Sequence, residues 1–245
     1  MKRLGGIVSS TAQPHDIIFL TGEMGTGKSR FAQGFVQSLC RDDTMAVPSP
    51  TFFLDNTYPI KFQFPKMQTF VPHVTGGVAG EDVTSKVAVG DGDGGGEGEE
   101  EDVVIHHMDL YRLGQDLSSQ QLSRIHIPQV FDQRTISLIE WADYLIRYNE
   151  QSGDVLGLSH RNILRVMLKY SNSNTNGSSS SDPFSLPLST TDDTNNNEEY
   201  DDYGEEEDRI VTLSTNSEAW KARIQHVLDQ MTTIEQHDNN DRSSE

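Results

Sequence analysis

One eight-residue stretch carries the clearest chemistry in the sequence, because it matches the phosphate-binding loop pattern G-x-x-x-x-G-K-[S/T]. The stretch reads Gly22-Glu23-Met24-Gly25-Thr26-Gly27-Lys28-Ser29. Glycines at these spacings let the backbone curl so that successive N–H groups point at phosphate oxygens. Lys28 would neutralise the β- and γ-phosphates, and the Ser29 hydroxyl would bind Mg²⁺. We therefore predict that all eight residues bind the nucleotide, with ATP and Mg²⁺ as cofactors.

The residues around this loop supply the context that a phosphate-binding loop needs. The run from Asp16 to Thr21 is apolar and partly β-branched, which predicts a buried strand before the loop. From Lys28 to Cys40 the apolar residues recur at helical spacing, which predicts an amphipathic helix after the loop. A chance match in a glycine-rich segment would not be expected to have both flanking elements, so we interpret the motif as functional.

Two carboxylates follow apolar runs that predict further strands, and a phosphate-binding loop needs such an acid nearby to hold the metal. Glu140 ends the run Ile136-Ser137-Leu138-Ile139, and Asp109 follows Val103-Val104-Ile105. Either acid could instead cap a helix or lie at a solvated strand end. We predict that one of them binds Mg²⁺, directly or through water, and that the other positions the attacking water. The residues alone leave the division of roles open.

Four further residues near these motifs allow more than one interpretation. Thr51, in Ser49-Pro50-Thr51-Phe52, could sense the γ-phosphate as switch loops do, or could simply start a strand. His106 and His107 occupy adjacent strand positions, which point to opposite faces, so we interpret both as structural and not as metal ligands. Trp141 could be a partner contact or a plain core residue, and the residues alone favour the core.

The predicted elements alternate between strands and helices along the chain. Strands are predicted over 16–21, 51–58, 103–105, 136–139, 161–170 and 210–213, and helices over 4–15, 28–40, 142–148 and 217–231, with 117–131 helical or turn-like. Interleaved strands and helices favour an α/β fold. We therefore predict a single P-loop NTPase-like domain, in which helices flank a mostly parallel sheet.

Two acidic tracts, residues 81–102 and 171–208, together carry the whole formal net charge of −19. Tracts this polar, the first glycine-rich and the second serine- and asparagine-rich, cannot bury enough apolar surface to fold. The predicted organisation is a P-loop ATPase domain over 1–170 with a disordered insertion at about 59–102, a disordered tract over 171–208, a strand and helix of the same domain over 209–232, and a tail over 233–245.

The remaining composition excludes several classes of protein. Cys40 is the only cysteine, so an intrachain disulfide is impossible and a reducing compartment fits best. No apolar run reaches the roughly 20 residues that a bilayer requires, and the N-terminus lacks the apolar region of a secretory signal. Outside the acidic tracts the chain is neutral, which gives no sign of strong direct binding to nucleic acid. We expect a protein that is neither secreted nor membrane-bound.

Four motifs occur in an order that resembles one known family. They are the phosphate-binding loop continued by Arg30-Phe31, then Ser49-Pro50-Thr51-Phe52, then His107-Met108-Asp109-Leu110-Tyr111-Arg112-Leu113, and then Leu138-Ile139-Glu140-Trp141. Many families share the loop, but the other three motifs are quite specific. Together they resemble the TsaE family, the small P-loop ATPases of bacterial and organellar tRNA threonylcarbamoyladenosine synthesis. The match covers residues 4–58 and 103–170, with 208–231 as a further candidate range.

This resemblance implies a set of residue roles and a partner. Ser29 and Glu140 would hold Mg²⁺, Asp109 would support hydrolysis with Lys28, Thr51 would belong to a switch-like loop, and Trp141 would lie near the nucleotide and the partner face. Family members act with the TsaD–TsaB complex, which modifies tRNA, so contact with tRNA would be indirect. The acidic tracts are not family features and suggest a eukaryotic copy, working in the cytoplasm or in an organelle.

Two other functions share the phosphate-binding loop. A small-molecule or nucleoside kinase should carry a basic lid, but Arg124 and Arg134 are isolated along the sequence. A nucleotide-sensing subunit that does not hydrolyse ATP would have no physical need for Lys28, Asp109 and Glu140 together with Ser29. Phosphate transfer to an added acceptor would identify the kinase, and ATP binding without hydrolysis would identify the sensor.

Overall fold

The computed structural model describes residues 1–50, 54–63, 100–114, 117–132, 134–171, 185–188 and 208–242. Contacts divide the chain into two units, one formed by Met1–Ile60 with Val103–Glu245 and the other by Lys61–Asp102. The phosphate-binding loop and both predicted carboxylates belong to the first unit. The predicted insertion over 59–102 and the tract over 171–208 lie largely outside the described residues.

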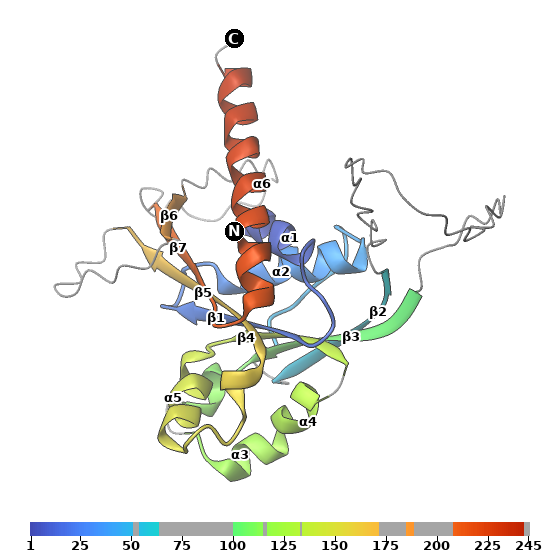
Figure 1. Cartoon of the computed structure of the whole chain (residues 1–245), viewed down its shortest axis with the longest axis vertical. Helices are drawn as coiled ribbons and strands as arrows, with labels where there is room; N and C mark the ends of the chain where they lie inside the picture. Colours follow the sequence, from blue (N-terminus) through green and yellow to red (C-terminus); the bar gives the residue numbers. More distant parts are fainter. Residues whose placement is uncertain are drawn as a thin grey trace, which may run out of the picture. The chain divides into compact units, whose positions relative to one another are not determined.

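A seven-stranded sheet with the order β2-β3-β4-β1-β5-β7-β6 forms the centre of the fold (Figure 1). The strands are β1 Asp16–Gly22, β2 Asp55–Gln63, β3 Glu100–Asp109, β4 Thr135–Glu140, β5 Asn162–Tyr170, β6 Ser185–Leu188 and β7 Arg209–Ser214. β1 is parallel to β4 and β5, and β3 is parallel to β4. β7 runs antiparallel to β5, and β6 antiparallel to β7. The predicted α/β fold is confirmed. The sheet is mixed, with parallel strands β3, β4, β1 and β5 at its centre and antiparallel strands β7 and β6 beyond β5.

Helices cover both faces of the sheet in the first unit (Figure 1). They are α1 Lys2–Ser9, α2 Lys28–Cys40, α3 Ser119–Arg124, α4 Ile127–Asp132, α5 Asp143–Gln151 and α6 Glu218–Arg242, with 3₁₀ turns at Tyr111–Leu113 and Leu158–His160. α1, α2 and α6 lie on one face, and α3, α4 and α5 lie on the other. This double cover explains why β1 and β4 are apolar, nearly fully buried runs.

Two glycines allow α1 to pack closely against α2. A Cβ atom on Gly34 would lie 1.9 Å from the carbonyl oxygen of Lys2, and one on Gly5 would lie 2.1 Å from that of Phe31. Only glycine can occupy these positions without moving a backbone. The close crossing also brings the buried side chain of Met1 against Gly27 of the phosphate-binding loop.

The structure differs from the sequence prediction at several elements. The helix predicted over 4–15 is α1, which begins at Lys2 and ends at Ser9. β2 continues to Gln63 and β3 begins at Glu100, so the described ends of the predicted disordered insertion are strand. The strand predicted over 51–58 begins at Asp55, after Leu54 has taken a left-handed conformation with φ of 65°. The last helix, predicted over 217–231, continues to Arg242 and so occupies most of the predicted tail. β6 lies inside the tract predicted to be disordered, where four residues pair with β7.

Candidate nucleotide-binding site

The predicted phosphate-binding loop connects the end of β1 to the start of α2, as its motif requires. Gly22, Gly25 and Gly27 have φ angles of 128°, 82° and 102°, a region that side-chain-bearing residues rarely adopt. Thr26 Oγ1 donates a hydrogen bond to the carbonyl oxygen of Glu23 at 2.9 Å, which braces the loop. No side chain caps the N-terminus of α2, and its first turn contains no acid. The loop and helix end therefore offer backbone N–H groups suited to phosphate oxygens.

Lys28 lies inside the curl of this loop. Its side chain is buried, and Nζ donates hydrogen bonds to the carbonyl oxygens of Gly22 at 2.7 Å and Glu23 at 2.6 Å. The same Nζ lies 4.0 Å from the ring centre of Trp141, a distance that permits a cation–π interaction. Burial lowers the pKa of Lys28, while the negative charge of Glu140 opposes that shift. The positive charge thus lies where the motif predicts a phosphate contact.

Glu140, at the end of β4, is held by two side chains. Its Oε2 accepts a hydrogen bond from Ser29 Oγ at 2.7 Å, and its Oε1 lies 2.9 Å from His107 Nε2. Glu140 and His107 are each only 1% exposed, so water competes little for these bonds. The hydroxyl and the carboxylate predicted to hold Mg²⁺ therefore meet directly, although they lie 111 residues apart in the sequence.

Asp109 lies beside Glu140, because β3 and β4 are parallel and these two residues are register partners. Asp109 Oδ2 accepts a hydrogen bond from Ser49 Oγ at 3.0 Å, and Oδ1 accepts one from the backbone N–H of Tyr111 at 2.9 Å. These contacts join the end of β3 to the Ser-Pro-Thr motif. Thr51, the predicted γ-phosphate sensor of that motif, lies outside the described residues.

Trp141 lies at the edge of the site, where it packs against the hydrophobic core, as its residue type favours, but stays partly exposed. It is half-buried, has a left-handed φ of 59°, and follows Glu140 directly. Its ring lies 4.8 Å from the ring of Tyr111 and 6.0 Å from that of Tyr144, measured between centroids. Met24, at the loop, exposes 63% of its surface. Apolar and aromatic surface therefore flanks the polar centre.

Two residues near the predicted site were missed by the sequence interpretation. His107, interpreted only as structural, contacts Glu140, whereas His106 points to the other face and lies 2.8 Å from Asp55, through Nδ1 and Oδ2. Asp143, the first residue of α5, accepts a hydrogen bond from the backbone of Gly22. Burial raises the pKa of Asp143, and that backbone bond opposes the shift. The position of Asp143 soon after the Glu-Trp pair was the one available signal.

Ser29 and Glu140 are the two described oxygen-bearing side chains that meet at the predicted metal position. In the described part of the chain, no group of three or more His, Cys, Asp or Glu side chains could hold a metal ion. Mg²⁺ at phosphate sites needs only one or two protein ligands, since phosphate oxygens and water complete its octahedron. Ser29 and Glu140 match that requirement.

No helix in the described part of the chain is long and apolar enough to cross a membrane.

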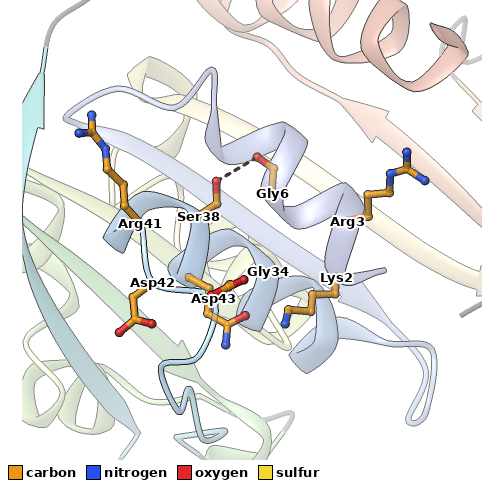
Figure 2. Close-up of a pocket in the computed structure, with 9 residues that line it drawn as sticks. Lys2, Arg3, Gly6, Gly34, Ser38, Arg41, Asp42 and Asp43 are labelled. Carbon is orange, nitrogen blue, oxygen red and sulfur yellow. Dashed lines mark hydrogen bonds between the residues drawn. The ribbon is translucent and has the colours of Figure 1, made fainter. Parts of the chain in front are cut away.

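A cavity of about 740 Å³ lies elsewhere, between α1, α2 and the residues that follow α2 (Figure 2). Its lining includes three cations, Lys2, Arg3 and Arg41, and two acids, Asp42 and Asp43. Ser38 Oγ bridges the two helices there by donating to the carbonyl oxygen of Gly6 at 3.4 Å. None of the residues predicted to bind nucleotide or metal lines this cavity.

The fold and the loop define a P-loop-type α/β protein, in which the motif follows the central parallel strand β1, and acids end β4 beside it and β3 next to β4. A family model described as "Threonylcarbamoyl adenosine biosynthesis protein TsaE" matches residues 1–70. The proteins named tRNA threonylcarbamoyladenosine biosynthesis protein TsaE in Rickettsia felis and Rickettsia conorii are each 35% identical to this chain over 57 residues. These matches cover 23% of this chain and 33% and 32% of the two relatives.

A longer match extends to the TsaE protein of Rickettsia bellii, which is 24% identical over 144 residues, or 59% of this chain and 69% of the relative. The crystal structure of Bacillus subtilis YdiB aligns with 96% of this chain and 88% of its own, with 14% identity and a TM-score of 0.40. In the two shorter matches, the chain spans about a third of the length of the R. felis and R. conorii relatives. The family model and the curated relatives support the TsaE family, which confirms the resemblance predicted from the motifs.

Proposed function

We propose that this chain is a Mg²⁺-dependent ATP-binding and ATP-hydrolysing subunit required for N6-threonylcarbamoyladenosine modification of tRNA. The observation that carries the proposal is the hydrogen bond between Ser29 and Glu140 at 2.7 Å, formed beside Lys28 at the carboxyl ends of parallel strands. A phosphate-binding loop whose hydroxyl meets a strand-end acid is the arrangement that P-loop NTPases use to hold nucleotide and metal.

Each side chain has a role that follows from its position. The loop N–H groups and the N-terminus of α2 would bind the phosphates, and Lys28 would neutralise their charge. Ser29 and Glu140 would hold Mg²⁺, which when bound would neutralise charge on the β- and γ-phosphates. Asp109, fixed by Ser49 and by the backbone of Tyr111, would orient the attacking water. Thr51 would sense the γ-phosphate, a role that rests on its motif alone.

The proposed partner is a TsaD–TsaB-like threonylcarbamoyltransferase complex. The family relationship supports this choice, since the curated relatives are named for tRNA threonylcarbamoyladenosine biosynthesis. ATP hydrolysis by this subunit would support turnover of the complex, and tRNA would be contacted through the complex. The compartment that we propose is the cytoplasm or an organelle.

The test is Mg²⁺-dependent ATP hydrolysis by the purified chain, alone and with a TsaD–TsaB pair from the same source. We expect hydrolysis that the pair stimulates and that Glu140→Ala abolishes. ATP binding without hydrolysis in either setting would contradict an ATPase and favour a nucleotide-sensing subunit. Transfer of phosphate to an added small-molecule acceptor would favour a kinase instead.

A further inference from the structure

We propose that His107 is a positioning residue that orients the Glu140 carboxylate toward the magnesium ion. This inference rests on the proposed function and deepens it. Oε2 of Glu140 accepts from Ser29 Oγ at 2.7 Å, and Oε1 lies 2.9 Å from His107 Nε2. Each oxygen of the carboxylate therefore has its own polar contact, one with Ser29 of the phosphate-binding loop and the other with the histidine.

The strand register explains why this histidine reaches Glu140. Asp109 and Glu140 are register partners on parallel strands, so their side chains share one face of the sheet. His107 lies two positions before Asp109, and alternation along the strand returns it to that same face. The contact is thus built into β3 and β4 and does not depend on a loop.

The surroundings of the ring indicate which nitrogen carries the proton. His107 Nδ1 is buried and has no hydrogen-bond partner among the described residues. A buried N–H without an acceptor is costly, whereas Nε2 faces a carboxylate oxygen that can accept. The tautomer with the proton on Nε2 therefore fits the site, and in that tautomer His107 donates to Glu140.

Fixing one carboxylate oxygen also fixes the other. The terminal torsion of a glutamate side chain has a broad energy profile, so the carboxylate can rotate unless a neighbour holds it. His107 supplies that restraint in a site from which water is largely excluded. Partners of this kind tune the groups that bind a metal and contribute about 10–100-fold to metal affinity or activity. We expect His107 to affect metal binding more than phosphate binding.

His107→Gln and His107→Asn form a matched pair for the test. Both introduce a neutral amide, but the longer glutamine can place its N–H group near the position of Nε2, whereas asparagine is too short. His106→Gln is the control, because His106 lies on the opposite face and pairs with Asp55. For each protein, Mg²⁺ is titrated against a fixed concentration of a fluorescent ATP analogue, and affinity for the analogue is measured separately in EDTA.

We expect His107→Asn to raise the Mg²⁺ concentration needed for half of the fluorescence change of the ATP analogue by about 10–100-fold. His107→Gln and His106→Gln should stay close to the wild type, and affinity in EDTA should be similar in all four proteins. An unchanged Mg²⁺ requirement in His107→Asn would overturn the role of His107, as would equal losses in the Gln and Asn variants. Failure of the wild type to bind the analogue with Mg²⁺ would overturn the proposed function as well.

Discussion

Lys28 brings a buried positive charge into the nucleotide site, and its loss should weaken phosphate binding directly. We predict that Lys28→Ala lowers affinity for ATP by at least about 100-fold. The variant would lose hydrogen bonds to both the β- and the γ-phosphate, and hydrogen bonds to charged groups contribute about 1.5–3 kcal/mol each. A titration with a fluorescent ATP analogue measures the change. Lys221→Ala is the control, since Lys221 pairs with Glu218 on the surface of α6. Equal affinity in Lys28→Ala and the wild type would refute the predicted phosphate contact.

Asp143 makes a second prediction possible, because burial raises its pKa above the ordinary value of 3.8. An acid whose pKa is raised by folding keeps its proton in the folded state while the unfolded chain loses it. Stability therefore falls as pH rises above about 3.8. Asp143→Asn removes this titration but keeps an oxygen to accept from Gly22. We expect the Tm of Asp143→Asn to exceed that of the wild type near pH 7, and the difference to shrink toward pH 4.

Thermal unfolding of both proteins over pH 4–8 measures this effect. Because each comparison is made at one pH, the titrations of other groups that both chains share largely cancel. A wild-type Tm higher than that of Asp143→Asn near pH 7, with this gap closing toward pH 4, would show that the Asp143 carboxylate is stabilised by folding, contrary to the direction inferred from its burial.

At the scale of elements, the crossing of α1 and α2 should tolerate a methyl group at one glycine and not at another. A Cβ atom at Gly34 would lie 1.9 Å from the backbone oxygen of Lys2, whereas at Gly6 its nearest neighbour would be 3.8 Å away. We predict that Gly34→Ala destabilises the fold by about 1–3 kcal/mol or more, since backbone must move. Gly6→Ala should stabilise it by up to about 1 kcal/mol through helix propensity.

Urea unfolding of the two variants and the wild type tests this pair of opposite signs. Both substitutions make the same chemical change within a helix, so helix propensity favours alanine in each case. If Gly34→Ala were as stable as Gly6→Ala, the close approach of the two helices would be refuted.

Local patterns predicted some elements well and others poorly. The apolar run of β1, the glycine loop and the amphipathic pattern of α2 all form where the sequence indicates, because each is specified by neighbouring residues. β6 was missed because four residues in a polar tract give a weak pattern, and their strand forms by pairing with β7. The contact of Arg223 with Asp16, which joins α6 to the start of β1, spans 207 residues and has no local signal.

Across the whole molecule, the predicted site came together for a topological reason. Acids at the carboxyl ends of neighbouring parallel strands must share one edge, so Asp109 and Glu140 could be grouped before their contacts were known. The bond from His107 to Glu140 and that from Gly22 to Asp143 depend on register and side-chain packing. A single sequence does not specify register or side-chain packing. The residues that support the site were therefore harder to predict than the residues that carry its chemistry.

The phosphate-binding loop and its partners belong to the unit formed by Met1–Ile60 and Val103–Glu245, so residues 64–99 should be dispensable for nucleotide binding. The ends of that segment already meet, since Gln63 Nε2 donates to Glu100 Oε1 at 2.8 Å. Lys61 and Asp102 pair at 2.7 Å in the same register. An Asn-Gly turn, which favours tight hairpins, should therefore replace 64–99.

We predict that the shortened chain unfolds cooperatively and binds the fluorescent ATP analogue as tightly as the full chain. A second variant, with a flexible Gly/Ser linker in place of 64–99, controls for strain in the tight turn. Thermal melts and nucleotide titrations of both variants make the measurement. If both variants lost cooperative unfolding, residues 64–99 would be needed to complete the fold. If both folded but lost affinity for ATP, those residues would take part in nucleotide binding, which the composition of the acidic tract does not predict.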